Sequence, residues 1–177
     1  MDIKEYRDAV KYFSDNQENF EFTNKGVQHA ASVVANLIRT SKDELLIYSG
    51  NMSKDVANDP YLVKMLNTFL KSGKTLRIVL DEMPKEEEQS ESLKQIITSS
   101  KNMKNSVILK IDKDKSFSKA MREVSKDKEV HHFMVADGIA YRFEIDALQY
   151  KAICNFNDKK IAGELKVAFD RQFEAMQ

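Results

Sequence analysis

The sequence predicts an α/β fold, with a mixed, largely parallel sheet that has helices on both faces. Segments with helical spacing alternate along the chain with short apolar segments. Several apolar segments are almost continuously hydrophobic, as strands are when both faces of their sheet are covered. The 177 residues include only five Gly and two Pro, and no low-complexity linker divides them. We therefore expect a single domain over residues 1–177, with the N-terminal helix 1–14 as an extension.

In the N-terminal half, capping residues indicate where helices begin. Thr23 or Asn24 is the expected cap of a long amphipathic helix. Asp59 and Pro60 are typical of a helix start, because Asp caps the free N–H groups and Pro suits the first turn. Gly73 is typical of the end of that helix. The expected helices are 3–13, 23–41 and 59–73, and the expected strands are 45–48 and 74–82.

In the C-terminal half, the acidic residues 86–88 predict the first turn of another helix, where the helix dipole favours negative charge. The segment 115–129 is compatible with either a short helix or a loop. The remaining expected helices are 86–103 and 158–176, and the remaining expected strands are 105–112, 130–137, 140–146 and, as a short strand, 151–156.

The stretch 129–144, EVHHFMVADGIAYRFE, contains the candidate catalytic residues His131, His132, Asp137 and Glu144. Asp137-Gly138 predicts a two-residue hairpin turn, because both central positions of that turn need φ > 0. In this register His131 faces Glu144, which would raise the pKa of the histidine, and His132 lies on the opposite side of the hairpin. The alternative is that one histidine is a hydrogen-bonded polar residue at a strand end and the other is exposed to solvent.

Composition limits the cofactors and partners that we expect. Lys+Arg and Asp+Glu both number 28, so the zero net charge argues against nucleic-acid binding over the whole surface. A Lys-rich region, Lys101–Lys128, remains a candidate for local contact with nucleic acid. Adjacent histidines on a strand point to opposite faces, and the chain has one cysteine, so we expect no metal site and no cofactor.

The expected location is the cytoplasm, and no membrane contact is expected. The N-terminus has no apolar segment typical of a secretory signal, and no apolar run has the length of a transmembrane helix. Functional groups in α/β sheets tend to lie at the carboxyl ends of the strands. Ser49 and Asn51 follow the first expected strand and are candidates for ligand binding, as is Arg142 in the second arm of the hairpin. Asp81 and Glu82 lie at the corresponding end of the second expected strand.

The order of these segments over roughly residues 25–175 resembles the phospholipase D-like superfamily. The similarity lies in ELLIYSGNMS, KSGKTLRIVLDE, VHHFMVADGIAYRFE and AICNFNDKKIAGELKVAFDRQFEAM. The resemblance implies a phospholipase D-like sheet, and it adds Asn155 of the closing Asn-Phe segment as a ligand-binding candidate. Because active members with a single copy of this unit pair to build one site, the resemblance also implies a homodimer.

The His-x-Lys-x4-Asp motif of that superfamily is degenerate in this chain. Aligned on Asp137, the histidine position is occupied by Val130 and the lysine position by His132. Aligned on His131, only the histidine is kept. In the superfamily one histidine attacks phosphorus and the lysines stabilise charge on the phosphoryl oxygens, so the chain lacks a complete set.

We therefore expect a catalytically degenerate, non-enzymatic binding or regulatory module, with a partner protein or a phosphate-bearing ligand as its target. Three alternatives stay open. The first is a nucleic-acid-binding accessory protein. The second is a phosphodiesterase or nuclease whose histidine site is rebuilt from the residues of 129–144. The third is a purely structural subunit.

Overall fold

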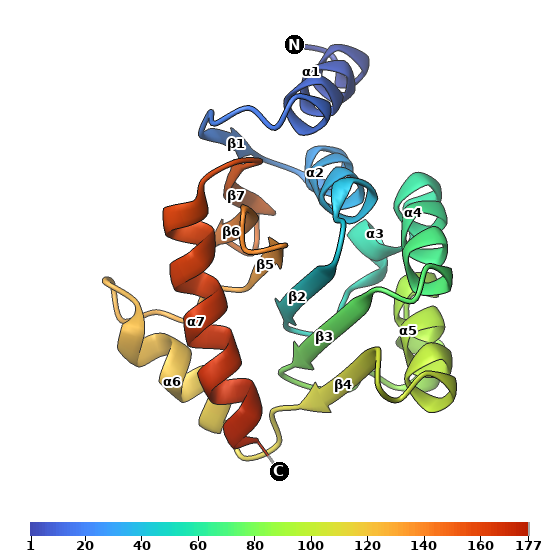
Figure 1. The fold of residues 1–177 in the computed structure, drawn as a ribbon, viewed down its shortest axis with the longest axis vertical. Coiled ribbons are helices and arrows are strands. Elements are labelled where there is room, and N and C mark those ends of the chain that lie inside the picture. Colours follow the sequence, from blue (N-terminus) through green and yellow to red (C-terminus); the bar gives the residue numbers. More distant parts are fainter. Residues whose placement is uncertain (177) are drawn as a thin grey trace.

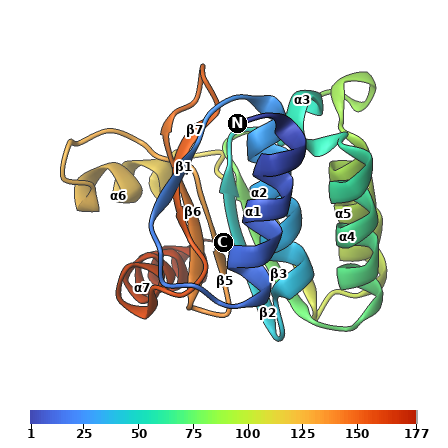
Figure 2. The ribbon, with the colours of Figure 1, turned by 90° about the horizontal axis from the view of Figure 1, so that it is seen from above.

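The computed structural model describes residues 1–176 and contains a seven-stranded mixed sheet with helices on both faces (Figures 1 and 2). The strand order is β1-β7-β6-β5-β2-β3-β4. The strands are β1 (Phe22–Asn24), β2 (Glu44–Ser49), β3 (Thr75–Leu80), β4 (Val107–Ile111), β5 (Phe133–Ala136), β6 (Ala140–Asp146) and β7 (Lys151–Asn155). The helices are α1 (Ile3–Asp15), α2 (Val27–Thr40), α3 (Lys54–Ala57), α4 (Pro60–Lys71), α5 (Glu91–Asn102), α6 (Ser116–Val124) and α7 (Lys159–Ala175), with a 3₁₀ turn, η1, at Glu86–Glu88.

The expectation of a largely parallel sheet is wrong, although the sheet is mixed. Within residues 1–176, only the pairings of β2 with β3 and of β3 with β4 are parallel. The other four pairings are antiparallel. The loops that join β5, β6 and β7 are too short for the crossover that a parallel connection needs, so these strands must form hairpins.

The helix boundaries follow the capping chemistry in most places. Asp59 accepts from the N–H groups of the first turn of α4, and Gly73 follows that helix with φ +77°. The expected cap of α2 is wrong: Thr23 and Asn24 belong to β1, and the N-cap is Gly26. The acidic residues 86–88 form the separate turn η1, and α5 begins after Ser90, whose hydroxyl caps it. The segment left open at 115–129 contains α6.

Two apolar layers cover the sheet. Helices α1, α2, α4 and α5 pack on one face, and α6 and α7 pack on the other, as the two views show. On β2, Leu45 and Ile47 belong to the first layer, whereas Leu46 and Tyr48 belong to the second. Covering both faces explains why this strand is continuously apolar in sequence.

The Asp137-Gly138 turn has the predicted backbone but not the predicted length. Asp137 and Gly138 have φ +56° and +64°, and Ile139 N–H donates to the carbonyl of Ala136 at 3.0 Å. Strand pairing, however, resumes only between Ala136 and Ala140, so three residues form the loop. The register of β6 against β5 is therefore shifted by one residue from the expected one.

This shift changes which histidine meets the glutamate. Glu144 N–H donates to the carbonyl of His132 at 2.9 Å, which places Glu144 opposite His132. The expected pairing of the Glu144 side chain with His131 is therefore wrong. The same register places Arg142 opposite Met134, on the face of the sheet that α2 and α4 cover.

None of the helices that the structure describes is both long and apolar enough to cross a bilayer.

Candidate functional site

His132 lies at the centre of a polar cluster at the carboxyl ends of β2 and β3. Its Nε2 is 2.7 Å from Asp81 Oδ2, and its Nδ1 is 3.6 Å from Glu144 Oε1. The Tyr48 hydroxyl donates to the other oxygen of Asp81 at 2.7 Å, and the Tyr48 ring meets the imidazole edge-on with centroids 4.9 Å apart. Both ring nitrogens of His132 therefore face carboxylates.

The carboxylates keep His132 positively charged at neutral pH. Burial disfavours the imidazolium, but the hydrogen bond to Asp81 and the nearby Glu144 carboxylate outweigh it and raise the pKa of His132 to about 9. Burial likewise pushes up the pKa of Asp81 and of Glu144, yet the imidazolium holds both pKa values below their ordinary range. The cluster is thus a set of ion pairs at pH 7.

Arg142 extends the cluster into the interior of the protein. Its side chain is only 10% exposed. The guanidinium donates to Glu144 Oε2 at 3.3 Å, through Nε to Asn24 Oδ1 at 3.1 Å, and through Nη2 to the carbonyl of Tyr150 at 3.3 Å. A buried cation is tolerated only when paired and hydrogen-bonded, and Arg142 meets both conditions.

A cavity of about 310 Å³ lies between α2, α3 and α4 and the strands β2, β5 and β6. Polar groups from Ser49, Asn51, His132, Arg142 and Glu144 line part of it. Apolar side chains from the three helices form much of the rest. This combination of apolar walls and a few convergent polar groups is typical of small-molecule sites.

The β6–β7 loop closes on α3 beside this cavity. Tyr150, which lines the cavity, donates its hydroxyl to Asp55 Oδ2 at 2.6 Å. In Figure 2 the β6–β7 loop and α3 both lie at the upper edge of the molecule. The bond links two segments that are 95 residues apart in the sequence.

Five of the eight residues that the sequence indicated line this cavity, namely Ser49, Asn51, His132, Arg142 and Glu144. The other three, His131, Asp137 and Asn155, do not.

His131 lies on the other side of the hairpin from His132. Its Nδ1 is 2.9 Å from the Glu144 carbonyl and its Nε2 is 2.7 Å from Asp127 Oδ2, while its ring packs on Phe143. It therefore connects the loop after α6 to β6, and the two histidines do not share a site.

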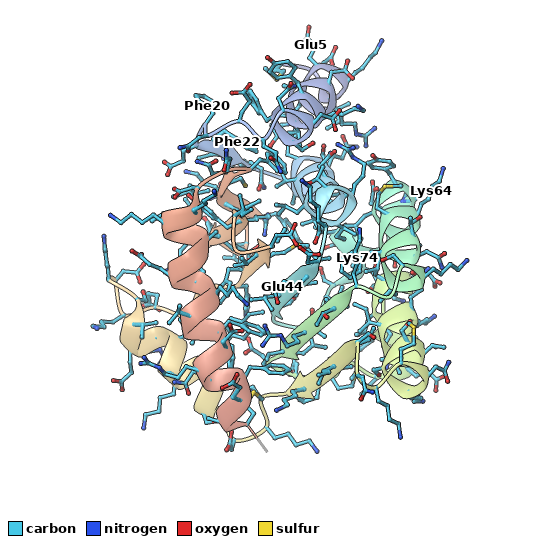
Figure 3. All side chains as sticks on the ribbon, in the orientation of Figure 1. Glu5, Phe20, Phe22, Glu44, Lys64 and Lys74 are labelled. Carbon is cyan, nitrogen blue, oxygen red and sulfur yellow. The ribbon has the colours of Figure 1, made fainter. Side chains whose placement is uncertain are left out.

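Asp137 and Asn155 have structural partners at other places. The Asp137 carboxylate accepts from the backbone N–H groups of Lys42, Asp43 and Glu44 at 2.8–3.0 Å. Lys42 and Asp43 precede β2 and Glu44 begins it, at the end of the sheet where Figure 3 labels Glu44 and Lys74. Asn155 donates to Asn19 Oδ1 at 3.0 Å and accepts from a backbone N–H two residues further on.

Sequence reasoning placed Asp81 at the end of an expected strand without choosing it as a candidate, and it missed two other members of the site, Asn24 and Tyr150. Asp81 had a detectable signal, because it directly follows a buried strand. Asn24 had none, because β1 has only three residues and meets Arg142 across 118 positions of sequence. Tyr150 binds Arg142 through its backbone carbonyl, which any residue type supplies.

The raised pKa of His132 predicts a loss of stability in mild alkali. A pKa that rises from the ordinary 6.5 to about 9 on folding stabilises the fold fully below pH 6.5, and this contribution disappears as pH rises through 9. It is on the order of 3 kcal/mol. Urea unfolding of the wild type and of His132→Gln at pH 6 and pH 9.5 measures it. Parallel pH dependence in the two proteins would contradict the ion pairing.

Comparisons with known proteins give structural neighbours but no family. No family model matches the chain, and no curated protein matches it by sequence. The archaeal chromatin protein TrmBL2, whose structure shows a novel mode of DNA binding, is similar over 97% of this chain and 60% of its own, with 14% identity and a TM-score of 0.57. What the two share is the fold. The chain thus spans about three fifths of the length of that protein.

A second neighbour is the phosphatidylserine synthase of Haemophilus influenzae Rd KW20. It matches 86% of this chain and 37% of its own chain, with 11% identity and a TM-score of 0.47. The likeness is too weak to assign this chain to a family.

Proposed function

We propose that the chain is a non-catalytic module that binds a ligand in the cavity beside His132. The observation that carries this proposal is the engagement of both imidazole nitrogens by carboxylates. A histidine that attacks phosphorus needs an unprotonated ring nitrogen directed at its substrate. With a pKa of about 9, roughly one molecule in a hundred has a neutral His132 at pH 7.

The other histidine supports the same proposal. Both nitrogens of His131 have partners, Asp127 and the Glu144 carbonyl, and the ring packs on Phe143 outside the cavity. The degenerate phospholipase D-like motif is consistent with this, because Val130 stands where the attacking histidine would be in the alignment on Asp137. The cavity, with its buried Arg142, remains suited to binding.

The proposal predicts that the protein does not cleave phosphodiesters. Labelled single- and double-stranded DNA and RNA, with and without Mg²⁺, should be cleaved no faster by the wild type than by the His131→Ala/His132→Ala double variant. Phosphodiester hydrolysis without a catalyst is many orders of magnitude slower than with one, so even a weak enzyme would be detected. Cleavage that the double variant loses would overturn the proposal in favour of a rebuilt nuclease.

A thermal-shift screen of small molecules tests the binding half of the proposal. Val56 lies on the wall of the cavity and is partly buried, so Val56→Trp should fill part of it. Ligands of the cavity should raise the melting temperature of the wild type but not that of this variant. The matched control is Val167→Trp, because Val167 on α7 is 60% exposed.

Nucleic-acid binding through Lys101–Lys128 is the second candidate, and the exposed lysines of α6 and its flanking loops favour it. Acidic residues are interspersed there, and Lys115 and Lys128 donate to backbone carbonyls of Asp81 and Glu123. Affinity for DNA that falls steeply from 50 to 200 mM salt would support this candidate.

A homodimer, also part of the proposal, is tested by sedimentation.

A further inference from the structure

We propose that the cavity selects an uncharged ligand that has an apolar body and one hydroxyl or amide group. This inference rests on the proposed function, since it names the class of molecule that the same cavity would bind. It departs from the phosphate-bearing ligand that the sequence suggested.

The charges beside the cavity are already balanced. Two cations, Arg142 and His132, lie against two carboxylates, Glu144 and Asp81, at distances of 2.7–3.6 Å. An anionic ligand would be repelled by these two carboxylates, and a cationic ligand would be repelled by the guanidinium and the imidazolium. The charged group of either ligand would lose its hydration without gaining an unpaired partner on the protein, which disfavours binding.

Neutral hydrogen-bonding groups are present at the same place. Ser49 follows the carboxyl end of β2, and its hydroxyl accepts from the Met52 N–H at 3.3 Å while keeping a proton that can donate. The Asn51 amide supplies both a donor and an acceptor, and it also lines the cavity. A hydroxyl or amide of a ligand is complementary to these groups.

The remaining walls suit an apolar body. Ala30, Val34 and Ile38 lie on one face of α2, and Leu62 and Leu66 come from α4. Burying an apolar group there removes the apolar surface of the ligand from water and, on the protein, mainly that of the partly buried Val34 and Val56, because the other four walls are already at most 2% exposed. At about 310 Å³, the cavity is at the small end of the range known for ligand sites, so the ligand must be compact.

Four probes with the same eight-carbon chain test the charge preference: 1-octanol, octylamine, octanoate and octyl phosphate. Binding to the full chain is measured by titration calorimetry at pH 7.5, below the micelle-forming concentration of each probe. We expect 1-octanol to bind at least tenfold more tightly than the three charged probes. We expect Val56→Trp to abolish this binding and Val167→Trp to leave it unchanged.

A charge-altering variant provides the reciprocal test. Glu144→Gln removes one carboxylate and leaves the cluster with a net positive charge, so octanoate and octyl phosphate should bind about tenfold more tightly than they bind the wild type. Circular dichroism checks the fold of the variant, and Asp81→Asn is the second variant for the same test. An unchanged preference in both folded variants would overturn the inference.

The outcomes separate the inference from the proposed function. If a charged probe binds the wild type most tightly and Val56→Trp abolishes that binding, the cavity is a ligand site but the inference is wrong. If no probe and no screened molecule distinguishes the wild type from Val56→Trp, the proposed function fails as well.

Discussion

Replacing Arg142 with methionine is expected to lower the free energy of unfolding by about 3–5 kcal/mol, the usual cost of removing one partner of a buried ion pair. The guanidinium is bonded to Glu144, to Asn24 and to the carbonyl of Tyr150. Methionine has a similar length but donates no hydrogen bonds, so all three acceptors would stay buried without this partner. Urea denaturation at pH 7 measures the change.

Two further variants distinguish this from a general effect of removing charge. Arg171→Met changes an exposed position on α7 and should stay within about 0.5 kcal/mol of the wild type. The double variant Arg142→Met/Glu144→Met removes both charges and should recover part of the loss, because an apolar pair no longer leaves a carboxylate unpaired. Strictly additive losses would contradict direct pairing of Arg142 with Glu144.

Replacing Asp137 with alanine is expected to cost about 2–4 kcal/mol. The carboxylate accepts from three successive backbone N–H groups, at Lys42, Asp43 and Glu44, which hold its pKa below the ordinary value despite partial burial. The backbone at Asp137 has φ +56°, a conformation that alanine adopts less readily than Asp or Asn. Thermal and urea unfolding measure the loss.

The substitution Asp137→Asn separates the two causes of this loss. Asparagine tolerates the positive φ and keeps one acceptor oxygen, and we expect about half the loss of the alanine variant. Glu174→Gln, at an exposed position of α7, controls for the loss of a negative charge. If Asp137→Ala unfolds like the wild type, the carboxylate does not hold the segment before β2.

Much of the fold could be predicted, because its signals are local. Asp59, Pro60 and Gly73 set the bounds of α4 through backbone chemistry that acts within a few residues. In the antiparallel half of the sheet, only the hairpin of β5 and β6 had such a local signal, in Asp137-Gly138. Which strands pair is decided by the order of the whole sheet, and β1, with three residues, is too short to show a pattern.

The candidate site was predicted in part for a related reason. Asp137 and Gly138 adopt the positive φ values that their residue types indicated. The loop nevertheless includes Ile139, and no local feature of that residue revealed it. One additional loop residue was enough to exchange His131 for His132 as the neighbour of the Glu144 side chain.

The length of that loop determines the chemistry of the cavity. With β5 fixed against β2, a two-residue turn in which Ile139 paired with Ala136 would bring Phe143 opposite His132 and would direct Arg142 and Glu144 to the side of the sheet that α6 and α7 cover. A relative with the same side chains but this two-residue turn would have the apolar ring of Phe143 beside its imidazole, in place of the Glu144 carboxylate. Whether Ala136 pairs with Ala140 or with the residue before it is therefore a better guide to altered specificity than substitutions among the charged residues themselves.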